Sequence, residues 1–164
     1  MSVKPTVPDG YTTVTAWIIL KGVDRFIEFL KDALRGEEVG RVLNQDGTIG
    51  HAEVKIGDAV VMMFDSAVGW PETPQFLRLY VEDSQAVYDR MIAAGCRPVT
   101  ELTEMAWGDK VGRVADPWGN LWWLQEQVEE VSEERWGEPK YVEAMAYVQR
   151  SLDEEMKGRG ALSK

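Results

Sequence analysis

One stretch decides the fold: Asp116-Pro117-Trp118-Gly119-Asn120-Leu121-Trp122-Trp123-Leu124. The residues Pro-Trp-Gly-Asn predict a tight turn, because proline fixes its own φ while glycine and asparagine tolerate a positive φ. The apolar, aromatic-rich run that follows predicts a β-strand of about six residues. A turn that leads into such a strand near the end of a folded unit is a landmark with which earlier segments can be compared.

The same order of elements occurs once before this landmark. Residues 14–20 form a β-rich run, and residues 24–34 have a helical apolar period, with Asp24 placed as the N-cap and Gly36 just beyond the C-terminal end. Three short strands are predicted next, at residues 38–43, 51–56 and 59–65. The predicted unit is therefore β-α-β-β-β.

A second unit of the same kind begins after a proline-containing linker at residues 66–74. Its predicted elements are a strand at 76–81, a helix at 83–94 and strands at 97–101, 110–115 and 121–126. Gly22, at the start of the first helix, lies 61 residues before Asp83, and the Gly57 turn lies 62 residues before Gly119. This near-constant offset indicates a tandem duplication.

The two ends of the chain differ from the modules. Residues 1–12 predict an extended arm, because prolines and glycine interrupt regular structure there. From about residue 129 the sequence becomes charged and helical, and Pro139 suits the first turn of a helix that runs to about residue 157. The last residues are expected to fray. The apolar stripe of this helix must be buried on the core or on a second subunit.

Composition limits the class of partner. The chain has 164 residues, is 45% hydrophobic and carries a net charge of −10, so we expect a folded core and no binding to nucleic acid or to an anionic membrane. The acidity suits either a cationic partner or simple solubility. No apolar run approaches the roughly 18 residues of a membrane span, and the first residues lack the apolar segment of a secretion signal. We therefore expect a cytoplasmic protein.

Several segments, taken in order, resemble the glyoxalase/bleomycin-resistance/dioxygenase superfamily, also called vicinal oxygen chelate, and its PhnB-like branch. They are the two modules, the DPWGN turn with a Trp-Gly-Asp upstream, and the segments IILKGVDRFIEFLKDALRGEE, IGHAEVKIGDAVVMM, MAWGDKVGRVADPWGNLWWL and EEVSEERW. The similarity covers about residues 14–127. It implies that each module curls its sheet into half of a cup, with helices outside and a cavity inside, and that the protein is a dimer.

The resemblance also locates the positions where a metal would be held. The superfamily's metal enzymes take one ligand, His, Gln or Glu, from the first and the last strand of each module. The matching positions here lie near Thr15 and Val61 and at Phe76 and Trp123. A divalent ion needs several N or O donors at about 2 to 2.5 Å, and a chain with one histidine cannot form a two-histidine site. We therefore expect no metal and no other cofactor.

Strand alternation predicts which side chains line the cavity. If Trp123 points inward, so do its neighbours two residues away and the matching residues of the other strands. The predicted ligand-binding residues are Trp17, Phe76, Arg78, Tyr80, Trp107, Trp123 and Gln125. Aromatic walls of this kind suit a flat or cationic ligand.

Several of these residues have two interpretations. His51 and Glu53 share one face of their predicted strand and form either a general base oriented by a carboxylate or a structural pair; they are the candidate catalytic residues. Arg78 either grips a ligand carboxylate or balances Glu53 across the sheet. The loop of Trp107 is either a lid or a loop whose tryptophan is buried where the modules meet. Cys96, the single cysteine, has no evident base partner, so we expect an inert thiol.

The expected protein is α+β. Its domain spans residues 13–128, with modules at about 13–66 and 75–128 that form a cup-shaped mixed sheet, an arm at 1–12 and a C-terminal helical extension at 129–164. The favoured function is metal-independent binding of a small organic molecule, cationic or aromatic, by a homodimer, as in bleomycin-resistance-like and PhnB-like proteins.

Two other functions stay open. One is a lyase, isomerase or dioxygenase that uses His51 and Glu53 or a metal at positions outside the family pattern. The other is an interaction protein whose C-terminal helix packs on a partner.

Overall fold

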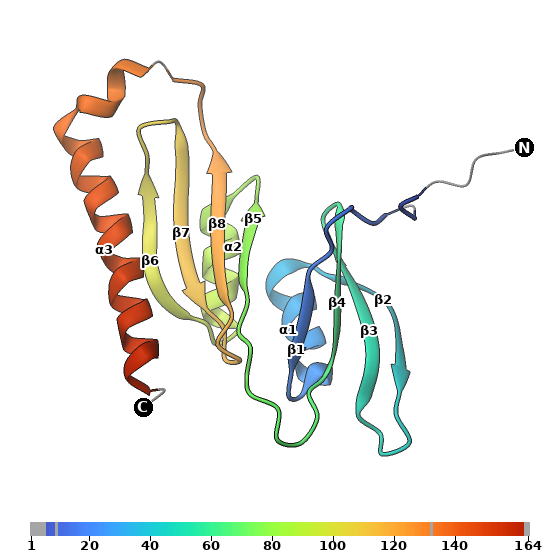
Figure 1. Ribbon diagram of the computed structural model, residues 1–164. Helices are drawn as coiled ribbons and strands as arrows, with labels where there is room; N and C mark the ends of the chain where they lie inside the picture. The colour runs from blue at the N-terminus through green and yellow to red at the C-terminus, as the bar shows by residue number, and fades with distance from the viewer. Residues whose placement is uncertain (1–5, 9, 132, 163–164) are drawn as a thin grey trace, which may run out of the picture. The chain divides into compact units, whose positions relative to one another are not determined.

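The secondary structure repeats one order of elements twice and then adds a helix (Figure 1). The structure is a computed structural model that describes residues 6–8, 10–131 and 133–162; residues 1–5 and 9 of the predicted arm lie outside this range. Two compact units, Met1–Gln75 and Phe76–Lys164, contain one β-α-β-β-β module each. The α+β class and the order of elements expected from the sequence are confirmed.

Module 1 is a four-stranded mixed sheet with one helix on one face. Its strands run in the order β1-β4-β3-β2, with β1 parallel to β4 and the other neighbours antiparallel. The alternation of buried and exposed residues along the strands places every second side chain under the helix. The elements are β1 (Trp17–Leu20), α1 (Val23–Leu34), β2 (Glu37–Leu43), β3 (Ile49–Ile56) and β4 (Ala59–Asp65).

The ends of α1 are held differently from the sequence-based expectation. Its N-cap is Gly22, with φ 81°, and not Asp24. The first amides of the helix are bound instead by the carboxylate of Asp65, which accepts from Gly22 N at 2.8 Å and from Val23 N at 3.1 Å. At the other end the left-handed residue is Arg35 rather than Gly36. Gly36 is needed for close packing, because a Cβ there would lie 2.8 Å from Val54.

Module 2 repeats this arrangement with the strand order β5-β8-β7-β6. Asp83 caps its helix by accepting from Ala86 N at 2.9 Å, and the carboxylate of Glu126 accepts from Ser84 N at 2.8 Å. Beneath the helix lie the buried side chains of Trp122 and Leu124, as the sequence predicted. The elements are β5 (Phe76–Tyr80), α2 (Ser84–Ala93), β6 (Arg97–Glu104), β7 (Asp109–Ala115) and β8 (Leu121–Gln127).

Strand register aligns the two modules residue by residue. Trp17 pairs with Met62 in module 1, and Arg78 pairs with Trp123 in module 2. Each residue of the second pair lies 61 residues after its counterpart in the first pair. The residue of module 1 that matches Trp123 is therefore Met62, next to Val61. Val61 is buried on the helix side of its sheet, whereas Met62 faces the other side.

The turn before β8 is built around the carboxylate of Asp116. This buried side chain accepts from Trp118 N at 3.0 Å, from Asn120 N at 2.9 Å, from Asn120 Nδ2 at 2.8 Å and from Trp122 Nε1 at 2.9 Å. Gly119 takes φ 89°, as the sequence predicted. One carboxylate thus ties the turn to the first residues of the strand that follows it.

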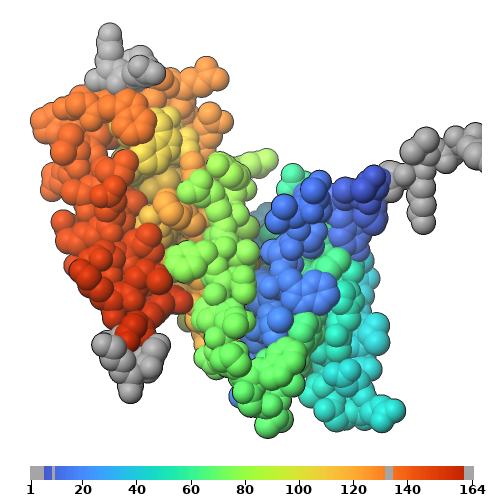
Figure 2. All heavy atoms as spheres, in the orientation of Figure 1, coloured from blue at the N-terminus to red at the C-terminus, as the bar shows by residue number. Residues whose placement is uncertain are grey.

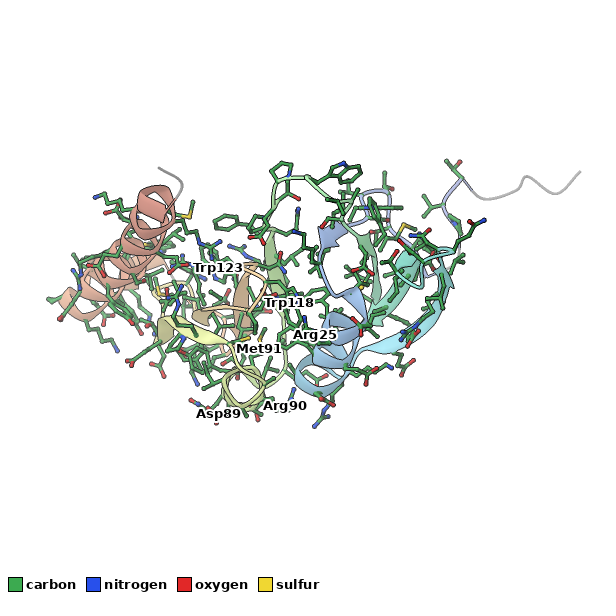
Figure 3. The ribbon with its side chains drawn as sticks, turned by 90° about the horizontal axis from the view of Figure 1, so that it is seen from below. Arg25, Asp89, Arg90, Met91, Trp118 and Trp123 are labelled. Atoms are coloured by element: carbon green, nitrogen blue, oxygen red, sulfur yellow. The ribbon has the colours of Figure 1, made fainter. Side chains whose placement is uncertain are left out.

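The C-terminal extension packs on module 2. It contains a short 3-10 helix, η1 (Glu133–Gly137), and α3 (Pro139–Leu162), which extends past the predicted end near residue 157. In Figure 1 α3 runs beside β6, and Figure 3 shows α2 and the labelled Trp123 on opposite sides of the second sheet. Val148 of α3 packs with Met105 and Val111 and against Trp123. The helix therefore covers part of the sheet face that α2 leaves free.

Polar contacts fix α3 along its length. Thr100 and Ser151 share a buried hydrogen bond of 2.7 Å between their hydroxyls. Glu155 forms ion pairs with Arg97 and Arg159, both at 2.8 Å, and Arg159 also donates to the carbonyl of Gly119 at 2.6 Å. The last of these contacts joins α3 to the DPWGN turn. Within the described part of the chain, no helix is both long and apolar enough to cross a membrane.

Candidate functional site

Module 1 presents a partly exposed aromatic face on the side of its sheet away from α1. We call this the open face of module 1; it consists of Trp17, Ile19, His51, Glu53, Met62 and Phe64. The ring of Trp17 lies 5.7 Å from that of His51 and 5.9 Å from that of Phe64, measured between centroids. Trp70 extends the cluster, at 6.1 Å from Phe64. Trp17 remains 42% exposed, although it is a large aromatic side chain.

A carboxylate with two partners lies on this open face. Glu53 accepts from the hydroxyl of Tyr11 at 2.5 Å and is 2.9 Å from Nε2 of His51. The hydrogen bond from Tyr11, together with that from His51, lowers the pKa of Glu53, and the same bond raises the pKa of Tyr11. The structure thus brings His51 and Glu53 together, as the sequence suggested, and adds Tyr11 from the N-terminal arm.

The arm also borders a shallow, open hollow next to the open face of module 1. A hollow of about 530 Å³ lies between the arm and β4, and Tyr11 and Met62 are on its wall. The other lining residues are Thr6, Val7, Pro8, Thr12, Thr13 and Thr15. Its size is within the range of small-molecule sites, roughly 300 to 1,000 Å³.

Module 2 carries most of the predicted ligand-binding residues on the sheet face away from α2. We call this the Trp123 face; it includes Phe76, Arg78, Tyr80, Val111, Arg113, Trp123 and Gln125. Phe76 is 55% exposed and Tyr80 is 71% exposed. Figure 2 shows the green segment of the chain, which contains β5, at the molecular surface. The β5 side of the face is therefore accessible, whereas α3 covers the β6 and β7 side.

Trp123 holds an arginine from the strand on either side of it. The guanidinium carbon of Arg78 on β5 lies 4.4 Å from the indole centroid, and that of Arg113 on β7 lies 3.8 Å from it. Strand β8 lies between β5 and β7, and Trp123 is paired with Arg78 on one side and with Arg113 on the other. Both contacts are within the range of cation–π interactions.

Two of the predicted ligand-binding residues, Gln125 and Trp107, contact other residues of the chain. Gln125 is buried and donates its amide to the carboxylate of Asp109. Trp107 sits at the β6–β7 turn, packs against the cluster under α3 and stacks on Trp136 at 5.4 Å. Gly108 in this turn has φ 88° and would place a Cβ 2.1 Å from the carbonyl oxygen of Glu129, so the turn is pinned against the start of the extension.

The single cysteine lies apart from both faces. Cys96 is buried at the start of the segment that leads into β6, and burial, with a smaller effect of Asp116, raises the pKa of its thiol to about 12. Because the thiolate is the reactive form, this shift agrees with the expectation of an inert thiol.

Comparison with known proteins identifies the family. The profile of the Glyoxalase/Bleomycin resistance protein/Dioxygenase superfamily matches residues 12–124. The chain belongs to this superfamily. An uncharacterized protein of Mycobacterium tuberculosis is 35% identical over 117 residues, which cover 65% of this chain and 69% of that protein.

Two solved structures show the same superfamily fold. TioX from a Micromonospora species superposes with a TM-score of 0.59 at 22% identity, over 74% of this chain and 100% of TioX. A PhnB protein from Bacillus cereus superposes with a TM-score of 0.55 at 17% identity, over 70% of this chain and 99% of that protein. The family match ends at residue 124, before the C-terminal helix α3 begins.

The residues at the superfamily's metal positions do not fit a metal ion. In module 1 they are at or near Thr15, whose hydroxyl donates to the carbonyl of Thr12, and Met62. In module 2 they are Phe76 and Trp123. Divalent ions need converging N or O donors, and within the described ranges no three His, Cys, Asp or Glu side chains come together.

Sequence reasoning missed Tyr11 and Arg113. Tyr11 lies in the arm, 42 residues before Glu53, whose carboxylate it binds. No local sequence pattern predicts a contact over that separation. Arg113 could have been found, because it is a charged residue in a strand whose other residues are mostly buried. Alternation along β7 would have placed it on the same face as Val111, and so beside Trp123.

Proposed function

We propose that the protein binds a small organic molecule on the aromatic faces of its modules without a metal ion, in the manner expected for the bleomycin-resistance-like and PhnB-like members of its superfamily. The observation that carries this proposal is the exposure of Trp17, Phe76 and Tyr80 on strand faces that the module helices leave free. Exposed clusters of large aromatic side chains mark binding sites in folded proteins. The donor set at the family's metal positions supports the metal-free part of the proposal.

The hollow beside Tyr11 adds a place of suitable size, and the aromatic cluster around Trp17 adds surfaces on which a flat ligand can stack. The ionised carboxylate of Glu53 favours a cationic group on the ligand of module 1. Trp123 differs from Trp17, because two guanidiniums already lie close to its ring and compete with a ligand for stacking on it.

A binding screen tests this function. Flat neutral, cationic and anionic compounds are titrated into the protein, and binding is followed by tryptophan fluorescence and isothermal calorimetry in parallel samples with EDTA and with a stoichiometric divalent ion. We expect saturable binding of at least one compound that Trp17→Ala or Tyr80→Ala weakens and that Val142→Ala, an exposed apolar change on α3, leaves unaltered. An absence of saturable binding across the panel, or binding that appears only with a stoichiometric divalent ion, would contradict the proposal.

A second candidate function is acid–base catalysis in module 1. The observation that favours it is the pair of contacts made by Glu53, which orients His51 and receives a hydrogen bond from Tyr11. This is the arrangement of a base held by a carboxylate, suited to a lyase or isomerase reaction. Turnover of a substrate identified in the screen should fall strongly in His51→Ala protein; unchanged turnover would remove His51 from the chemistry.

We also propose that the protein forms a homodimer. The edge strand β2 exposes three apolar side chains, Val39, Val42 and Leu43, and leaves its outer backbone groups unpaired in the sheet. A second copy of the chain would cover them. Analytical ultracentrifugation at high micromolar concentration should give the dimer mass, and a monomer under these conditions would refute the assembly.

A further inference from the structure

The Trp123 face carries two arginines that form no ion pair with a carboxylate among the described residues. Among the described residues, neither Arg78 nor Arg113 has a carboxylate oxygen within 4 Å. The carboxylate of Asp109 lies on the same face but is bound by Gln125. Two like charges therefore flank one indole ring in a chain whose net charge is −10.

Arg113 is buried, and only some of its hydrogen-bond donors have an acceptor among the described residues. It is 2% exposed, and its Nη1 donates to the hydroxyl of Thr100 at 3.1 Å and to the carbonyl of Val148 at 2.7 Å. Both acceptors are neutral. Its Nε is buried and has no acceptor in the described part of the molecule. Since Nη1 is engaged, the edge formed by Nε and Nη2 is the one that remains for a ligand.

A second buried donor on this face also lacks a partner. The indole Nε1 of Trp123 is buried, and within the described residues no acceptor lies within hydrogen-bonding distance of it. Nearly all buried N–H groups in folded proteins have an acceptor, so two orphaned donors on one face point to an acceptor that the chain itself does not supply. Burial, and then the charge of Arg78, lower the pKa of Arg113 to about 10, which is consistent with an uncompensated cation.

The chemistry of these groups selects the class of ligand. The Nε–Nη2 edge of a guanidinium matches the two oxygens of a carboxylate or a phosphate group, and a nearby indole N–H adds a third donor to such an oxyanion. A cation would meet two positive charges at the same place. The exposed rings of Phe76 and Tyr80 flank Arg78 on β5 and provide apolar surface for the rest of an organic anion.

Resting on the proposed small-molecule function, we infer that the Trp123 face of module 2 is an oxyanion site formed by Arg78, Arg113 and the indole N–H of Trp123. Its ligand is a small organic carboxylate or phosphate. All of its residues belong to module 2, whereas the open face of module 1 is aromatic and acidic and favours a cationic group. Because Arg78 is exposed, its guanidinium is the part of the site that a ligand reaches first.

The experiment uses the seven tryptophan indole N–H signals in a ¹H–¹⁵N correlation spectrum of the full chain. The signal that is missing in Trp123→Phe protein belongs to Trp123. Benzoate, phenyl phosphate and inorganic phosphate are titrated to about 10 mM, a range that detects even weak binding. Benzamidine, the cationic analogue of benzoate, and sodium chloride at matched ionic strength are the controls.

We expect the Trp123 signal to shift with saturation in at least one oxyanion and to stay still with benzamidine and chloride. Stronger binding of the phenyl compounds would identify an organic anion, whereas equal binding of inorganic phosphate would identify free phosphate as the ligand. Arg78→Gln should weaken the affinity at least about tenfold, the effect of losing one charge-assisted hydrogen bond. Arg150→Gln, which removes an exposed charge from α3, should change it less than about twofold.

Three outcomes would overturn the inference. They are a Trp123 signal that no oxyanion moves, a shift that Arg78→Gln leaves intact, and saturable binding of benzamidine in place of benzoate. The last outcome would leave the proposed binding function standing. If neither the oxyanions nor any compound of the binding screen binds, both the oxyanion site and the proposed small-molecule function are refuted. Arg113→Lys keeps the charge but loses the fork, and should weaken binding in the same direction as Arg78→Gln.

Discussion

Replacement of Asp116 by alanine should destabilise module 2 by about 4 kcal/mol. The carboxylate is 5% exposed and accepts four hydrogen bonds. Three of the donors, Asn120 N, Asn120 Nδ2 and Trp122 Nε1, belong to buried residues and would lose their acceptor. A buried donor left unsatisfied costs about 1 to 3 kcal/mol, so the three together give an upper range of about 3 to 9 kcal/mol.

Removal of a buried charge returns part of this cost. Burial raises the pKa of Asp116 in spite of its hydrogen bonds, which shows that the ionised carboxylate is itself expensive to bury. The net loss is therefore placed in the lower half of the range. Asp116→Asn keeps one acceptor oxygen but turns an amide N–H₂ toward two of the donors, so it should lose about 2 kcal/mol.

Urea unfolding followed by tryptophan fluorescence and far-UV circular dichroism measures these losses. The matched control is Asp46→Ala, because Asp46 also accepts two hydrogen bonds in a turn, from Thr48 N and Thr48 Oγ1, but is exposed. It should lose less than about 1 kcal/mol. A loss below about 1 kcal/mol for Asp116→Ala, or an equal loss for Asp46→Ala, would refute the argument that burial gives this carboxylate its importance.

Three further predictions concern acidity, the arm and metal. Burial alone would raise the pKa of Glu155, but Arg97 and Arg159 outweigh it and lower the pKa, so its contribution is present above the ordinary value of 4.5 and is lost as pH falls through the folded-state value. The urea midpoint should thus fall less between pH 7 and pH 3.5 in Glu155→Gln protein than in the parent; an equal fall would contradict this. Glu53→Gln should lower the raised pKa of Tyr11, seen as tyrosinate absorbance at lower pH, and an unchanged titration would show that the bond is absent in solution. EDTA should leave the unfolding temperature unchanged, because the family's metal positions carry no histidine, carboxylate or amide ligand, and a clear decrease would reveal a bound ion.

The local pattern of the sequence was sufficient to predict the secondary structure of both modules. Alternation in the strands, the turns at Gly57 and Gly119 and the helical apolar stripes depend on neighbours within a few residues, and the observed elements agree with them to within a few positions. The helix caps were harder. Asp24 has the right chemistry for an N-cap, but Asp65, 42 residues away, reaches the first amides instead. A competition between two carboxylates for the same amides is decided by tertiary packing.

Alternation and the offset between modules also indicated the faces that carry the candidate sites. They placed Trp17, Arg78 and Trp123 on the sheet faces away from the module helices and put His51 next to Glu53. Neither of them indicated that Gln125 is held by Asp109 or that Trp107 packs under α3. Those contacts depend on which strand lies beside which and on where the C-terminal helix packs.

What the sequence by itself determined is therefore the family, the duplicated module and the lack of histidine, carboxylate or amide ligands at the metal positions, since all of these depend on residue type and short-range order. Only the tertiary structure decided the chemistry of the Trp123 face. Arg113 lies beside Trp123 through strand register, and it donates a hydrogen bond to the carbonyl of Val148, 35 residues away on α3. The guanidinium is buried, and among the described residues its Nε has no acceptor. A charge in a strand becomes a candidate binding site only when its surroundings are assembled from distant segments.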